Sequence, residues 1–175
     1  MLFRSRAIDW AEAQSEIDRE HIGIIGFSLG ATVASLVAAN EPRVRASVLA
    51  MGGANVNEMF ATCFGRAEEA RNLIIGRLGW TAETFGQKLA APLAPINPAS
   101  FPDRVDPKRV IIFDAAYDTC IPESGREALW QAMGKPQRIS WPYNHKMAFL
   151  TMSPLGLNTM RRKIYKDRKS TRLNS

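Results

Sequence analysis

The sequence predicts an α/β domain with a mainly parallel sheet flanked by helices. Short apolar segments of strand length alternate with longer segments of helical periodicity along most of the chain. The first apolar segment runs directly into a glycine-bounded turn, G-F-S-L-G at residues 26–30, and then into a helical pattern. With 175 residues, 46% of them hydrophobic, the chain has enough apolar side chains for one core and is not intrinsically disordered.

The expected elements follow one another as helix 7–17, strand 22–26, helix 31–39, strand 44–51, short helices within 55–90, strand 109–113, helix 123–133, strand 138–143 and a closing helix 152–166. In the first helix, Trp10, Ala13 and Ile17 lie at helical spacing and predict one buried stripe. The strand 22–26 is apolar throughout, which predicts a central strand covered on both faces. The small apolar side chains of 31–39 predict a deeply buried helix.

Residues of about 55–105 interrupt this alternation. Their apolar side chains recur at the spacing of short amphipathic helices, and five prolines between residues 92 and 107 mark an irregular connector. We interpret the segment as a lid or connector insertion over an acyl pocket in a catalytic domain of residues 1–166, with ordinary helix packing as the alternative.

The basic charge of the chain lies at one end. Residues 161–175 hold seven Lys and Arg against one acid, Asp167, and so carry the whole net charge of +6. The other 160 residues balance 16 bases with 16 acids, so the body of the chain lacks the basic surface of a nucleic-acid-binding protein. We interpret residues 167–175, D-R-K-S-T-R-L-N-S, as a disordered and non-native tail without a role in function.

Composition also argues against several other classes of protein. No apolar run approaches the ~20 residues of a membrane-spanning helix, and residues 1–6 lack the apolar stretch of a secretory signal, which favours the cytoplasm. Cys63 and Cys120 lie far apart without CxxC spacing, which argues against a disulfide scaffold or a zinc site. We expect Cys120 to be a small buried filler, and we expect no metal and no cofactor.

The G-x-S-x-G segment is the sharpest chemical signal. A serine at a tight turn between strand and helix has its hydroxyl lifted clear of the sheet and the helix N-terminus beside it. Such a turn strains the backbone, so Gly26 and Gly30 are expected to avoid steric collisions on either side of Ser28. The alternative is a glycine-rich packing turn in which Ser28 is only a helix cap.

A serine nucleophile needs a base, and the chain has two histidines. His21 precedes the first strand and is expected at the surface, whereas His145 follows the last strand, at the sheet edge where Ser28 is expected. Two carboxylates follow the third strand, and we favour Asp118, in the loop, over Asp114, at the strand end, as the group that orients His145. The order serine, aspartate, histidine is typical of α/β hydrolases.

These motifs resemble the C-terminal portion of an α/β hydrolase of the esterase, dienelactone-hydrolase and prolyl-oligopeptidase branches. The matching segments are I-D-R-E-H-I-G-I-I-G-F-S-L-G-A, V-L-A-M-G-G, R-V-I-I-F-D-A-A-Y-D-T-C-I-P and Y-N-H. The resemblance implies Ser28 as nucleophile, Asp118 as acid, His145 as base and the Leu29 amide as one oxyanion donor. Two departures fall in loops, since such proteins often carry glycine in place of Ala115 and Asn144; the nucleophile elbow itself is matched by Gly26 and Gly30.

The resemblance implies a cofactor-free serine hydrolase that cleaves a carboxylic ester through an acyl-enzyme. The alternatives are a serine peptidase of the prolyl-oligopeptidase type and a non-catalytic binding module of the same fold. The expected partner is a small-molecule ester or peptide, and the oligomeric state stays open. In such hydrolases several strands precede the nucleophile strand, but here only one helix precedes residue 22. We therefore expect a partial α/β-hydrolase fold with its N-terminal strands missing, weakly active or inactive as it stands.

Overall fold

Four strands pair in parallel, in the order in which they occur in the sequence. In the computed structural model, which describes residues 6–151, the sheet order is β1 (Gly23–Phe27), β2 (Ala46–Ala50), β3 (Val110–Ala115) and β4 (Gln137–Trp141). Phe27 is level with Ala50, Ala50 with Phe113, and Phe113 with Ile139, so all carboxyl ends meet at one edge. The mainly parallel sheet is confirmed, and each strand lies within two residues of its expected bounds.

Helices connect the strands and fill the interruption between β2 and β3. They are α1 (Arg6–Glu12), α2 (Leu29–Asn40), α3 (Val56–Thr62), α4 (Arg66–Leu78), α5 (Ala82–Leu93) and α6 (Glu123–Ala132), with 3-10 turns η1 (Arg19–His21), η2 (Ala94–Ile96), η3 (Pro98–Ser100) and η4 (Pro107–Arg109). Residues 145–151 are also helical. The expected closing helix 152–166 and the tail lie outside the described residues. Over residues 6–151, no helix combines the length and hydropathy needed to cross a membrane.

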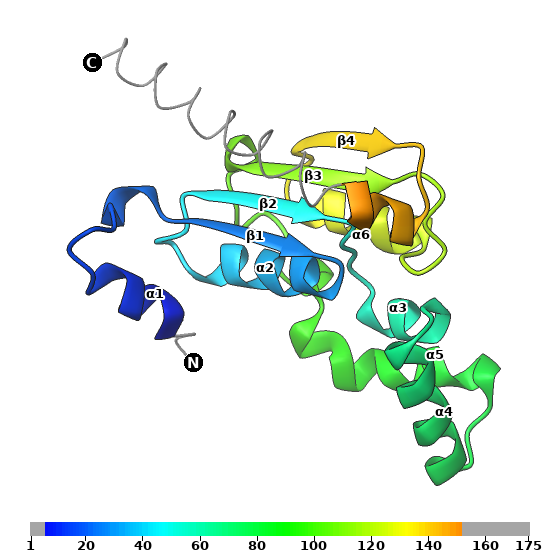
Figure 1. The fold of residues 1–175 in the computed structure, drawn as a ribbon. Helices are drawn as coiled ribbons and strands as arrows, with labels where there is room; N and C mark the ends of the chain where they lie inside the picture. Colours follow the sequence, from blue (N-terminus) through cyan, green and yellow to red (C-terminus); the bar gives the residue numbers. More distant parts are fainter. Residues whose placement is uncertain (1–5, 152–175) are drawn as a thin grey trace.

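The core has two layers, one on each face of the sheet. On one face, α2 and α6 pack against the strands through side chains that include Ala34, Leu49 and Leu129. On the other face, Val48 and Phe113 pack with Ala148 of the helical segment 145–151. Neighbours along β2 thus contribute to opposite layers, as the pleat requires. Figure 1 shows α3, α4 and α5 grouped beyond the carboxyl end of β1, beside the sheet rather than on it.

Three expectations about burial are wrong. Within the described residues β1 is an edge strand, so Ile25 remains 39% exposed instead of being covered on both faces. The first helix ends at Glu12 and buries Ile8, whereas Trp10 is 65% exposed. The helix α2 is buried along one face only, because nothing in the described residues covers the face that carries Val33. In each case an apolar side chain occurs where the described chain provides no packing partner.

The turn between β1 and α2 requires one of its two glycines for steric reasons. A Cβ placed on Gly26 would lie 2.2 Å from the backbone oxygen of Gly30, which no real side chain can do. A Cβ placed on Gly30 would meet no described atom within 4 Å. The expected collision is therefore present at Gly26 and absent at Gly30. The strand and the start of the helix therefore approach each other closely at Gly26.

The two glycines provide a matched test of this packing. Gly26→Ala should lower the free energy of unfolding by about 3 kcal/mol and the melting temperature by roughly 10 °C, because the new methyl group overpacks backbone that cannot move aside. Gly30→Ala should leave the melting temperature unchanged or slightly higher, because alanine favours the helix. Thermal melts followed by circular dichroism measure both. Equal stability of the two variants would contradict the assignment.

Candidate active site

Ser28 lies at the junction of β1 and α2, with a backbone conformation that residues other than glycine rarely adopt. Its φ is 53° and its ψ is −123°. The Ser28 amide donates a hydrogen bond to the carbonyl of Ala50 at 2.9 Å, and its own carbonyl accepts from Ala31. Holding a non-glycine residue at such angles costs about 1–3 kcal/mol, so the surrounding contacts must enforce it. They leave the serine hydroxyl at the carboxyl edge of the sheet.

Asp118 lies in the loop after β3, and its side chain is fully buried. One carboxylate oxygen, Oδ1, accepts from the backbone amides of Cys120 at 2.8 Å and Ile121 at 2.9 Å. The Asp118 amide donates to the carbonyl of Ala115, which also accepts from the buried Arg126 guanidinium at 2.6 Å. The loop therefore holds this carboxylate by its own backbone and leaves the second oxygen, Oδ2, for another partner.

His145 is that partner, and it also reaches the serine. Its Nδ1 lies 2.7 Å from Asp118 Oδ2, and its Nε2 lies 2.9 Å from Ser28 Oγ. An ionised carboxylate only accepts hydrogen bonds, so Nδ1 carries the proton and Nε2 accepts from the serine hydroxyl. The structure thus brings together the three residues that the sequence selected, in one chain of hydrogen bonds.

Asn144 positions the histidine by capping the helical segment 145–151. Its side-chain Oδ1 accepts from the amide of Met147 at 3.0 Å, and its carbonyl accepts from Ala148 at 2.9 Å. The α/β hydrolases that the sequence resembles often carry glycine at this position, and no role was predicted for the asparagine. An asparagine directly before an apolar helical pattern is itself a capping signal.

The other two candidates have different partners. Asp114 is buried at the end of β3, where it forms an ion pair with Arg138 and makes no contact with His145. Burial raises the pKa of the Asp114 carboxyl above its ordinary value, and the Arg138 guanidinium opposes that rise. His21 lies exposed in η1, where Asp18 Oδ2 is its partner at 2.7 Å.

The cysteines differ from expectation. Cys63, just after α3, and Cys120, two residues beyond Asp118, form a disulfide across 57 residues of sequence. Cys120 is buried, as expected of a filler, but it is a covalent cross-link. Their sequence spacing gives no hint of this pairing, because the fold alone brings the two segments together. The bond ties the insertion between β2 and β3 to the loop that carries Asp118.

Phe64 directly follows Cys63 and belongs to the segment of about 55–105, whose apolar side chains the sequence predicted to form a lid or connector. The Phe64 ring lies edge-to-face with the His145 ring, with centroids 6.2 Å apart and planes at 85°. The ammonium of Lys146 lies 4.8 Å from the centre of the same phenyl ring. The sequence placed this ring in the predicted lid or connector but gave no sign of its contact with His145.

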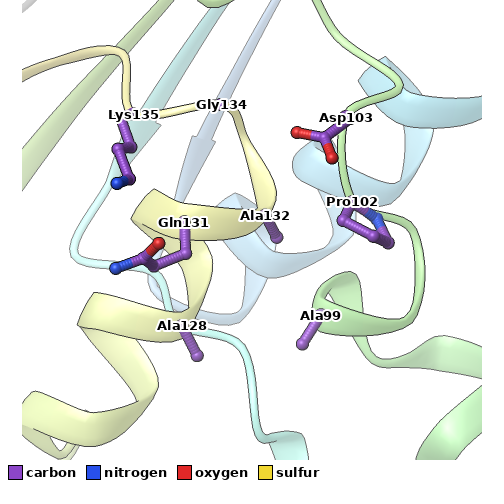
Figure 2. A pocket seen from close by; sticks show the side chains of 8 residues that line it. All are labelled: Ala99, Pro102, Asp103, Ala128, Gln131, Ala132, Gly134 and Lys135. Carbon is purple, nitrogen blue, oxygen red and sulfur yellow. The ribbon is translucent and has the colours of Figure 1, made fainter.

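A separate groove of about 540 Å³ lies between α6 and the chain around η3. Figure 2 shows one side of the groove formed by α6 and the loop after it, and the other side formed by Ala99, Pro102 and Asp103. None of Ser28, Asp118 and His145 lines it. Among residues 6–151, no group of three or more His, Cys, Asp or Glu is placed to hold a metal ion.

Comparison with known sequences gives one partial match. A model of the dienelactone hydrolase family matches residues 3–75, which include Ser28 but neither Asp118 nor His145. The match covers fewer than half of the 175 residues, so it shows a similarity to that family over this segment. No curated protein matches the sequence.

Solved structures extend the similarity over the described sheet. An acetyl xylan esterase from Paenibacillus sp. R4 has a TM-score of 0.67 at 18% identity, with 92% of this chain and 50% of that chain covered. An esterase from Pyrococcus furiosus has a TM-score of 0.63 at 16% identity, with 91% of this chain and 59% of that chain covered. An acylaminoacyl peptidase from Pyrococcus horikoshii has a TM-score of 0.57 at 12% identity, with 81% of this chain and 22% of that chain covered.

This chain therefore has a partial α/β-hydrolase fold. It spans half to three fifths of the length of the two esterases and a smaller share of the peptidase. At these identities the structures share the fold, and the comparisons together support an α/β hydrolase.

The cross-link is directly testable. Alkylation with iodoacetamide in denaturant should add no group to the unreduced chain and two groups after reduction, as measured by intact mass. Reduction should lower the melting temperature by about 10 °C, because opening a 57-residue separation removes about 4 kcal/mol by the loop-entropy relation. Two alkylated cysteines before reduction would contradict the disulfide.

Proposed function

We propose that this chain is a serine hydrolase that cleaves a carboxylic ester through an acyl-enzyme. The observation that carries the proposal is the continuous chain of hydrogen bonds from Ser28 Oγ through His145 to Asp118. A serine is a weak nucleophile unless an adjacent base removes its proton, and a base acts efficiently when a third group orients it. Both distances fall within hydrogen-bonding range before any substrate is bound.

The first half of the reaction forms the acyl-enzyme. Ser28 Oγ attacks the ester carbonyl while its proton passes to Nε2 of His145. The imidazolium that results is stabilised by the buried carboxylate of Asp118. The developing oxyanion is placed beside the Leu29 amide, at the N-terminus of α2, where the helix dipole favours negative charge. Collapse of the tetrahedral intermediate expels the alcohol, which takes the proton from Nε2.

The second half releases the acid. Water attacks the acyl-serine ester and gives its proton to Nε2 of His145. The second tetrahedral intermediate collapses, the carboxylic acid leaves, and Ser28 Oγ recovers the proton. Each proton given up by an oxygen is held at Nε2 and returned to another oxygen, so the residues are unchanged after one turnover. No cofactor is needed for this cycle.

A serine peptidase is the second candidate, and the structural similarity to an acylaminoacyl peptidase favours it. The two activities share the same residues and differ in the leaving group, an alcohol or an amine. Parallel assays with a p-nitrophenyl ester and an acyl-amino-acid p-nitroanilide separate them. Ester cleavage that exceeds anilide cleavage by more than the difference in intrinsic reactivity supports the esterase.

Substitution of the serine tests the nucleophile. Ser28→Ala should abolish the burst of p-nitrophenol from p-nitrophenyl acetate and should abolish covalent labelling by a fluorophosphonate, because no oxygen remains to be acylated. The melting temperature should change little, because the substitution removes one hydroxyl group and keeps the backbone hydrogen bonds of residue 28. The burst and the labelled mass measure this directly. Because we expect weak turnover from a partial fold, covalent labelling is the deciding measurement, and wild-type protein that is not labelled at Ser28 would indicate a non-catalytic binding module.

The two buried aspartates provide a matched pair. Asp118→Asn should lower the acylation rate by about four orders of magnitude, because an amide no longer holds the imidazole with its proton on Nδ1. Asp114→Asn should lower it by less than tenfold, because that carboxylate pairs with Arg138. Single-turnover acylation at pH 7 compares them. The reverse ranking would transfer the role of the acid to Asp114.

A further inference from the structure

Phe64 is the aromatic side chain that lies against the His145 ring from the insertion between β2 and β3. The contact is edge-to-face, at 6.2 Å between ring centroids, and 37% of Phe64 remains exposed. The ring is therefore neither a buried core residue nor free in solvent. It is an apolar surface presented beside the imidazole whose Nε2 faces Ser28.

The backbone around Phe64 is held by contacts to the loop that carries Asp118 and by contacts within the insertion. The neighbouring Cys63 is bonded to Cys120, and the Thr62 hydroxyl donates to the Cys120 carbonyl at 3.0 Å. The Arg71 guanidinium donates to the carbonyl of Cys63 at 3.1 Å and to those of two residues of α3 at 3.0 Å. These bonds hold the short segment after α3 at a set distance from the loop that carries Asp118.

The position of Phe64 relates it to one part of an ester. In the proposed reaction, which this inference rests on, Nε2 of His145 must give its proton to the departing alcohol. The leaving group therefore passes beside the imidazole, whereas the acyl group remains on Ser28. A phenyl ring packed against the imidazole therefore lies near the group that protonates the departing alcohol.

We infer that Phe64 is a specificity-determining residue that favours esters of aromatic alcohols, and that the Cys63–Cys120 disulfide is the positioning element that holds its ring beside His145. An aromatic leaving group can pack against the phenyl ring as the ester bond breaks, and such ring pairs are stabilised beyond what the area that they bury provides. A small alkyl alcohol makes little contact there.

Two acetate esters separate leaving-group selection from general catalysis. Phenyl acetate and methyl acetate give the same acetyl-enzyme, so deacylation is common to both and only acylation differs. Each ester is compared between wild type and variant, which cancels its intrinsic reactivity. Phe64→Ala should lower kcat/KM for phenyl acetate by about fivefold to tenfold and change that for methyl acetate by less than twofold.

The role of the disulfide is tested by the ratio of kcat/KM for phenyl acetate to kcat/KM for methyl acetate. Cys63→Ala, or treatment of wild type with tris(2-carboxyethyl)phosphine, should produce the same selective loss as Phe64→Ala, because the ring is no longer held. The phosphine should have no further effect on the ratio in Cys63→Ala or Phe64→Ala. Phe101→Ala is the matched control, since that ring packs against Arg104 in the connector. Melting temperatures establish that each variant is folded at the assay temperature.

The outcomes distinguish this inference from the function on which it rests. If a fluorophosphonate does not label Ser28 in wild type, the proposed function fails and the inference fails with it. If Ser28 is labelled but Phe64→Ala lowers both esters equally or neither, the inference alone is overturned, and Phe64 serves only to pack the histidine. A selective loss in Phe64→Ala without one on reduction overturns the role of the disulfide.

Discussion

The register of the four parallel strands is the constraint on which the rest of the molecule depends. At the carboxyl edge, the first loop residue after a strand donates its amide to a carbonyl of the neighbouring strand. Ser28 donates to Ala50 at 2.9 Å, Met51 to Phe113 at 2.7 Å, and Ala116 to Trp141 at 2.8 Å. The sheet ladder thus continues one residue into each loop, and the loops leave the sheet from fixed positions. A slip of one residue in any strand would turn its side chains to the other face and displace the loop that follows.

Two buried carboxylates share this edge, and the structure assigns each a different cation or donor. Asp114 is paired with Arg138, whereas Asp118 accepts from two backbone amides and the His145 ring. Burial raises the pKa of Asp114, and the nearby charge of Asp118 adds to that rise. Pairing Asp114 with a guanidinium leaves Asp118 as the carboxylate available to the imidazole. This division explains why neighbouring aspartates of the same loop region are not interchangeable.

Much of the fold and of the candidate site could be predicted from the sequence, because both rest on local patterns. Apolar runs located the four strands, and the glycine-bounded turn placed Ser28 at the end of the first. Parallel strands bring their carboxyl ends together, which directed attention to Asp118 and His145. Here the hydrophobic pattern and the topology agree, so three residues far apart in sequence were selected that the structure joins by hydrogen bonds.

What could not be predicted depends on which segments meet in space. Ile25 and Trp10 are apolar, yet their burial depends on cover that the described chain does not provide. Cys63 and Cys120 become partners only because α3 packs near the acid loop, and no spacing rule encodes that approach. Phe64 acquires its contact with His145 through the same approach. The collision expected at Gly30 is absent because no described atom outside the helix's own backbone lies within 4 Å of a Cβ added there.

The sequence separation of 117 between Ser28 and His145 has a consequence for how the molecule acquires its chemistry. Closing so long a loop is entropically costly, so this contact forms only when the intervening strands have already paired and repaid that cost. During folding the serine begins with the reactivity of any alcohol. Under the proposed function it becomes a nucleophile at the last stage, when β4 joins the sheet and carries the histidine into place. The reactivity of Ser28 Oγ then reports the fraction of molecules in which all four described strands have paired.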